Sequence, residues 1–180
     1  MKKLSAFILT MVMLLLVIAP VTNASALDIE SIENSKSPLW QTESCVTEVD
    51  YDYESGIYSV SVLEVSVLDV RVRGSGYVYK SATHSKYFYI ISSGEKVAEY
   101  TLTANFRYDK DNELAECRST SYTANSVVNK WTVSGASCVD NVTSALGAGR
   151  GDYSLYYNGN INNTDTIVIY CDYNGVITKN

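Results

Sequence analysis

The chain has 180 residues and a formal net charge of −6, from 14 basic and 20 acidic side chains. This is the length of a single domain with a core of its own. An acidic chain repels phosphate backbones, which argues against nucleic acid as a partner. Fifteen tyrosines, two prolines and little sustained helical periodicity favour strands over helices.

The N-terminus has the features of a secretory signal peptide. Lys2 and Lys3 precede the apolar run "AFILTMVMLLLVIAPV", and small residues follow up to Ala26. Pro20 and the shortness of the run argue against a spanning helix, which needs about 20 apolar residues. We therefore expect cleavage after Ala26 and a secreted, extracellular product that is not held in a membrane. Loss of the two lysines would change the net charge from −6 to about −8.

Three segments are expected along the chain. These are a signal peptide at 1–26, a polar N-terminal leader at 27–48 and a single β-sandwich domain at 49–180. The leader has a weak pattern and is expected to be disordered or loosely docked.

The first strand-like run, Ile57–Arg73, changes the parity of its apolar positions along its length. Because side chains alternate between the two faces, one straight strand cannot bury both sets. We expect a bend that carries the chain from one sheet to the other.

Residues 77–90, "YVYKSATHSKYFYI", are interpreted as a hairpin that closes around Ser81–Ser85. This would bring four tyrosines together on one face, where they could bind sugar rings or a protein partner. The alternative is that cross-strand tyrosines simply pack against each other. The residues of this candidate binding surface are Tyr77, Tyr79, Tyr87 and Tyr89.

Residues 96–108, "KVAEYTLTANFRY", form the clearest strand. Apolar and polar side chains alternate strictly, which is typical of a sheet with one buried face. A turn at Asp109–Asn112 would return the chain so that Ala104 faces Cys117, on the core side. The predicted buried set is Ala98, Tyr100, Leu102, Ala104, Phe106 and Tyr108.

Later strands are expected within "VVNKWTVS", "SCVDNVTSAL", "DYSLYYN" and "TDTIVIYCDY", the last followed by an Asn174-Gly175 turn. Short, regularly spaced strands predict an all-β fold, an antiparallel two-sheet sandwich, with a small open β-barrel as the alternative.

The four cysteines are widely spaced. An even number in an exported chain indicates two disulfides, and no close pair suggests zinc. We favour Cys117–Cys171, because both cysteines lie on predicted core faces, which leaves Cys45–Cys138; the two other connectivities stay open.

Asp109, Asp111 and Glu113 resemble the start of a calcium loop. Such a loop needs glycine at its sixth position and an acid at its twelfth, where this chain has Leu114 and Thr120. The acids are therefore interpreted as turn residues. No metal and no cofactor is expected.

Three further patterns could carry chemistry or binding. Asp50, Asp52 and Glu54 alternate and could perform acid–base hydrolysis, although a solvated strand end is the simpler interpretation. His84, at the predicted hairpin tip, is expected to be exposed. The Arg150–Asp152 tripeptide, in "GAGRGDYS", resembles an adhesion sequence on a mobile glycine-rich loop.

The "FRYD…C" hairpin, followed by a strand that ends in cysteine and "NG", resembles a group of small exported β-proteins of Gram-positive bacteria. The resemblance covers residues 96–178. No activity is known for that group, so the resemblance implies a fold and a location and transfers no functional residue.

The leading functional expectation is a secreted, non-enzymatic binding module whose partner is a cell-surface glycan or protein. The alternatives are a hydrolase that uses acidic residues and a secreted effector or antagonistic protein. The sequence leans against an enzyme and assigns no catalytic residue.

Overall fold

The computed structural model describes residues 40–68 and 76–180, within a compact unit that runs from Lys36 to Asn180. The expected signal peptide and most of the expected leader lie outside the described residues. Within them, no helix has the length and apolarity needed to cross a membrane.

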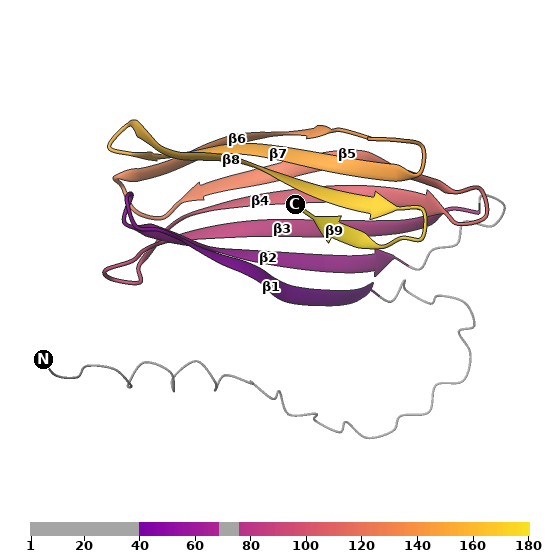
Figure 1. Cartoon of the computed structure of the whole chain (residues 1–180), viewed down its shortest axis with the longest axis horizontal. Coiled ribbons are helices and arrows are strands. Elements are labelled where there is room, and N and C mark those ends of the chain that lie inside the picture. Colours follow the sequence, from indigo (N-terminus) through magenta and orange to yellow (C-terminus); the bar gives the residue numbers. More distant parts are fainter. Residues whose placement is uncertain (1–39, 69–75) are drawn as a thin grey trace, which may run out of the picture. The chain divides into compact units, whose positions relative to one another are not determined.

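The described residues form two antiparallel sheets, each a meander of consecutive strands (Figure 1). This confirms the predicted sandwich, and no strand pairing among these residues joins the sheets into a barrel. The five-stranded sheet contains β1 (Trp40–Asp52), β2 (Ile57–Leu68), β3 (Val78–Ile90), β4 (Lys96–Asp109) and β5 (Leu114–Ser126). The four-stranded sheet contains β6 (Trp131–Val139), β7 (Leu146–Tyr157), β8 (Asn160–Asp172) and β9 (Ile177–Lys179).

Strand β4 forms the centre of the core. Its even-numbered residues from 98 to 108 are all buried, as their alternation predicts. Leu155 of β7 and Ile169 of β8, both fully buried, belong to the same cluster. Burying each such apolar side chain stabilises the fold by roughly 1.5–3 kcal/mol.

The turn between β4 and β5 is built by the Asp109 carboxylate. Its Oδ1 accepts the N–H groups of Asp111 and Asn112, at 3.0 and 3.2 Å, and its Oδ2 accepts the Asn112 side-chain amide at 2.7 Å. The side-chain bond from Asn112 leads the interactions that lower the Asp109 pKa. The predicted turn is confirmed, but Asp109 pairs with Leu114, so the loop is residues 110–113 rather than 109–112 and Cys117 faces Phe106 rather than Ala104. Cys117 still lies on the core face.

The hairpin predicted within residues 77–90 is wrong, because β3 continues through it. Ser81–Ser85 contains no glycine, proline, asparagine or aspartate to favour a turn. Instead, the Thr83 hydroxyl lies 3.2 Å from that of Thr103, and the Ser85 hydroxyl lies 3.0 Å from that of Thr101. These cross-strand contacts hold the segment extended against β4.

The expected mobile loop at "GAGRGDYS" is also wrong, since these residues belong to β7. Gly147, Gly149 and Gly151 are buried, and none has a positive φ. They are glycines because the opposite sheet comes so close: a Cβ on Gly147 would lie 2.5 Å from the backbone nitrogen of Cys117. The tripeptide Arg150–Asp152 is thus part of a strand.

Neither predicted disulfide is present, because all four cysteines are free. Cys117 and Cys171 do lie in the core, as predicted, but on different sheets, and each thiol donates to a nearby backbone carbonyl. Cys45 and Cys138 are exposed on β1 and β6, which are not neighbours in either sheet.

Two boundaries differ from expectation. Strand β1 begins at Trp40, inside the segment 27–48 that was expected to be a leader. Strand β2 does not bend between sheets within the described residues but stays between β1 and β3 throughout. Its residues at 57, 59, 61 and 63 are buried.

Candidate functional site

The inner face of the five-stranded sheet changes from apolar to polar across its width. Strand β4 presents alanine, leucine and aromatic side chains, whereas β2 presents Ser59 and Ser61, both buried. Glu48 and Asp50 of β1 stand directly opposite these serines and therefore project from the same face.

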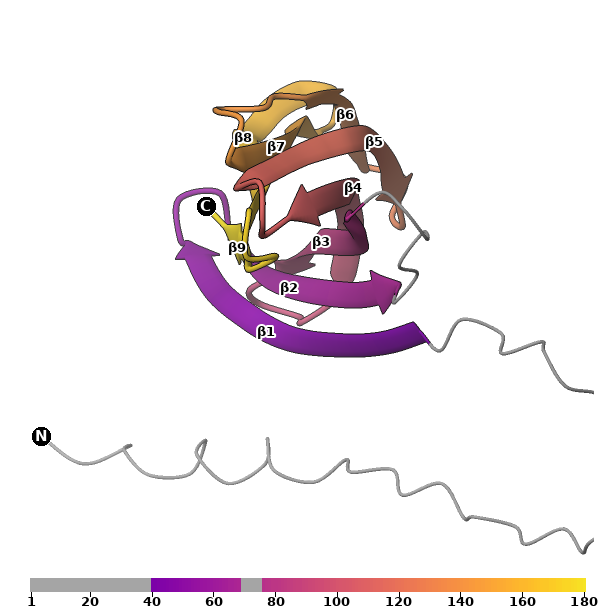
Figure 2. The same ribbon diagram turned by 90° about the vertical axis from the view of Figure 1, so that its right-hand side faces the viewer.

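The second sheet packs less closely over this polar half than over the apolar half. The four-stranded sheet packs mainly over β4 and β5, and among the described residues its main approach to β3 is through β8. Figure 2 shows β1 and β2 curling away from β6 and β7, with the short β9 near β1. On this side β8 has a strand partner only along Ile169–Cys171, where β9 pairs with it.

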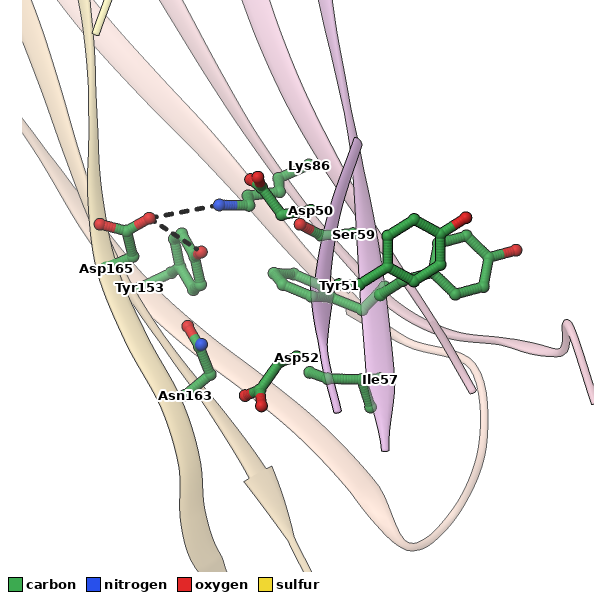
Figure 3. Close-up of a pocket in the computed structure, with 11 residues that line it drawn as sticks. Asp50, Tyr51, Asp52, Ile57, Ser59, Lys86, Tyr153, Asn163 and Asp165 are labelled. Atoms are coloured by element: carbon green, nitrogen blue, oxygen red, sulfur yellow. Dashed lines mark hydrogen bonds and ion pairs between the residues drawn. The ribbon is translucent and has the colours of Figure 1, made fainter. Parts of the chain in front are cut away.

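A cleft of about 220 Å³, here called the seam cleft, opens between these strands. Acidic side chains enter it from both sides: Asp50 and Asp52 from β1, and Asp165 from β8 (Figure 3). Its other lining residues include Ser59, Lys86, Phe88, Tyr153 and Asn163.

Lys86 and Tyr153 fix Asp165 in the cleft. Lys86 Nζ lies 3.2 Å from Asp165 Oδ2, and the Tyr153 hydroxyl donates to the same oxygen at 3.5 Å. Burial, followed by the charge of Asp165, raises the pKa of Tyr153, so its hydroxyl stays protonated. The ring of Tyr153 packs against Phe88, 5.4 Å between centroids, and forms an aromatic wall.

The three acids proposed for hydrolysis do not converge. Asp52 Oδ1 accepts the N–H groups of Glu54 and Ser55, each at 3.1 Å, and so caps the β1–β2 turn. Hydrogen bonds from the Ser55 hydroxyl and backbone lead the causes that lower the Asp52 pKa. Glu54 is exposed in that turn, and Asp50 alone of the three is available in the cleft.

His84 is not the exposed tip that the sequence predicts. It is 1% exposed, on the inner face of β3 between Leu63 and Leu102. It lines a second space of about 200 Å³, here called the inner cavity, which shares Asp50 and Lys86 with the seam cleft.

An ion pair closes the far side of the inner cavity. Lys179 Nζ of β9 lies 2.7 Å from Glu48 Oε2 of β1. The hydrogen bond and charge of Lys179 lower the pKa of Glu48. Asn180 extends this closure, because its side chain bonds Val168 N–H at 2.6 Å and Thr166 C=O at 3.1 Å.

The predicted tyrosine surface is only partly assembled. Tyr79 lies near the start of β3, and Tyr87 and Tyr89 lie near its end, with Tyr77 just before the strand. The four rings therefore do not pair across a hairpin. Tyr77 packs instead against Arg107, 4.4 Å from the guanidinium. Tyr89 joins a different row of stacked rings on the outer face, with centroid separations of 4.9, 5.4 and 5.8 Å: Tyr89, Tyr58, Tyr51 and Tyr53.

Two other features of the described residues offer no comparable site. A space of about 260 Å³ beside β5 is lined by groups already paired in the fold, including Arg107 with Glu116 and Asn141 with the Cys117 backbone. No group of three or more His, Cys, Asp or Glu side chains in the described part of the chain is arranged to hold a metal ion.

Sequence reasoning missed Lys86, Tyr153, Asn163 and Asp165. Lys86 could have been found from the sequence. It lies two residues before Phe88 and therefore points to the same inner face, provided that β3 is treated as one continuous strand. Asp165 carried no such signal, because its role depends on where β8 crosses β3. Comparisons with protein-family models, curated proteins and solved structures found no match.

Proposed function

We propose that the chain is an exported binding protein whose ligand, a glycan, occupies the seam cleft. The observation that supports this most is the polar inner face at the point where the second sheet stops. Burying polar groups without partners is costly, so a sandwich that sealed this region would be expected to use apolar residues. Serines and carboxylates there are suited to a polar ligand instead.

The side chains of the cleft suit a ligand rich in hydroxyl groups. A hydroxyl both donates and accepts hydrogen bonds, carboxylates accept, and an amide does both. Asp50 and Asp165 provide acceptors from opposite sides, and Asn163 provides an amide beside them. Tyr153 supplies the aromatic wall, as tyrosine often does in binding sites.

Export is supported by the N-terminal sequence pattern. A positive start, an apolar run and small residues before Leu27 fit a cleaved signal peptide. An extracellular location would place the cleft where cell-surface glycans are found.

A second function, glycosidic hydrolysis, is favoured by one observation. Asp50 and Asp165 face the same space from different strands, as the two carboxylates of glycosidases do. Lys86 forms an ion pair with Asp165 in this space. Binding remains the primary proposal, because both oxygens of Asp165 are already engaged within the fold, Oδ2 by Lys86 and Tyr153 and Oδ1 by the Thr166 N–H at 2.7 Å.

The test is retention of the purified protein on insoluble glycans. Cell-wall peptidoglycan, cellulose, chitin and xylan would be compared, with released sugars measured in the same tubes. The double variant Asp50→Asn/Asp165→Asn should bind about tenfold more weakly than the native chain, or weaker still. A tenfold loss corresponds to about 1.4 kcal/mol of binding free energy.

Asp111→Asn is the matched control, because it removes one carboxylate from an exposed turn away from the cleft. It should bind like the native protein. Retention on none of the glycans, or equal retention of the double variant, would refute the proposed function. Sugar release that the double variant abolishes would establish hydrolysis in its place.

A further inference from the structure

His84 is the one buried polar side chain of the cleft region that the fold leaves unsatisfied. It is 1% exposed, and neither Nδ1 nor Nε2 has a hydrogen-bond partner among the described residues. Buried polar atoms in folded proteins are nearly always paired, with protein, water or ligand. The imidazole lines the inner cavity, so a partner would be located there.

The imidazole is neutral at physiological pH. Burial lowers its pKa to about 4, and the charges of Lys179 and Lys86 act in the same direction, while Glu48 opposes them. A neutral imidazole has one N–H donor and one acceptor nitrogen. The matching partner is therefore a group that can accept and donate, as a hydroxyl does.

The charges around the inner cavity exclude strongly charged ligands. Lys86, which lines it, is already paired with Asp165, and the neighbouring Lys179 is paired with Glu48. A free anion would meet the carboxylates, and a free cation would meet the lysines. Asp50 adds a further carboxylate at the boundary with the seam cleft. A neutral, hydroxyl-bearing group is the chemistry that fits.

The two spaces form one extended site. They share Asp50, Lys86 and Asp165 as lining residues, so they lie next to each other between β1, β3 and β8. With volumes of about 220 and 200 Å³, together they reach the size typical of ligand sites, about 300–1,000 Å³. Such a site can hold consecutive units of one chain.

We propose that the inner cavity is a second sugar subsite, in which His84 forms hydrogen bonds with a ligand hydroxyl. This inference rests on the proposed glycan-binding function and adds a requirement to it. The ligand must be an oligosaccharide of at least two units, one beside Tyr153 and the next beside His84. A monosaccharide fills only part of the site and binds weakly.

The test uses the native protein with cellohexaose, chitohexaose, xylohexaose and a soluble peptidoglycan fragment as probes. The chain contains one histidine, so its imidazole nitrogen signals are unambiguous in ¹⁵N NMR. A probe that binds should shift both nitrogen signals of His84. His84→Phe, which keeps a flat aromatic ring but removes both polar atoms, should weaken the binding of that probe at least tenfold by calorimetry.

Two further variants control for indirect effects. His84→Gln keeps one donor and one acceptor and should retain more affinity than His84→Phe. Ser81→Ala, on the same strand but facing outwards, should bind like the native protein. The NMR measurement needs no substitution, so it decides the matter even if His84→Phe does not fold.

The outcomes separate this inference from the function on which it rests. If a hexasaccharide binds and Asp50→Asn/Asp165→Asn weakens it, but the His84 signals do not move, the inner subsite is refuted and ordered water satisfies the imidazole. If disaccharide and monosaccharide bind equally well, the second subsite is also refuted. If no probe binds, the proposed function itself fails.

Discussion

At the scale of single residues, His84 links the stability of the protein to pH. Its pKa is about 4 in the folded protein and near the ordinary histidine value of 6.5 in the unfolded chain. Between these values the unfolded chain binds a proton that the folded chain does not, so the free energy of unfolding falls as pH falls. The contribution is complete above about pH 6.5 and lost by about pH 4, and amounts to about 3 kcal/mol.

Urea denaturation at pH 7, 5.5 and 4.5 would measure this effect. His84→Gln has no group that titrates in the range and should show a smaller fall than the native protein. Carboxylates that do not interact with His84, such as Asp109, contribute to both proteins equally, so the difference between the two curves reports on the histidine and its coupling to Glu48. Identical slopes would show that the imidazole is not held neutral by burial.

Gly147 makes a second prediction at the residue scale. A Cβ there would lie 2.5 Å from the backbone of Glu116 and Cys117, which cannot move as a side-chain tip can. Gly147→Ala should therefore force the two sheets apart locally and destabilise the protein by roughly 1–3 kcal/mol. Ser154→Ala, at a half-buried position of the same strand, is the control and should change stability by about 0.5 kcal/mol or less. Equal midpoints in urea would contradict the close approach.

At the scale of elements, periodicity predicted some strands well and others badly. The strict alternation of apolar and polar residues in β4 was enough to predict that strand, because every second residue contacts the core. In β3 the inward residues are Ala82, His84, Lys86 and Phe88, a mixture that hides the same period from hydrophobicity alone. In β7 the three glycines indicate a loop when the sequence is considered alone. They are explained by the close approach of the opposing sheet, which the sequence does not reveal.

Strand β9 yields a prediction about the seam. Only Ile177–Lys179 pair with β8, and the Lys179–Glu48 ion pair ties this short strand to β1. Lys179→Met should cost little stability, about 0.2–1 kcal/mol, because the pair is partly exposed. It should nevertheless speed hydrogen exchange at Val168, whose N–H is held by Asn180. A double-mutant cycle with Glu48→Gln would check that the effect comes from the pair, and additive losses would show that it does not.

At the scale of the whole molecule, the sandwich was predictable and its open seam was not. Alternating strands indicate that one face of each is buried, but not which part of that face the second sheet covers. The part of the five-stranded sheet that the second sheet covers is set by the shortness of β9 and the position of β8. Both depend on contacts between residues that are distant in the sequence. For this reason the sequence identified Asp50 and could not bring it together with Asp165.

The two sheets share a single core, which predicts that they unfold together. Cys117 lies on β5 and Cys171 on β8, and both belong to the same buried cluster. Burial raises their pKa values to about 11 and 12, so their thiols should resist alkylation while the protein is folded. Cys45 and Cys138 are exposed and should react at once.

Pulsed alkylation of the reduced protein along a urea series, read by peptide mass spectrometry, would follow each thiol separately. Cys117 and Cys171 should become reactive at the same urea concentration, and this midpoint should equal the one measured by circular dichroism. A lower midpoint for Cys171 would mean that the four-stranded sheet detaches before the other unfolds. The seam would then be the boundary between two cooperative units, because the only strong connection left between the sheets would be the chain itself at residues 127–130.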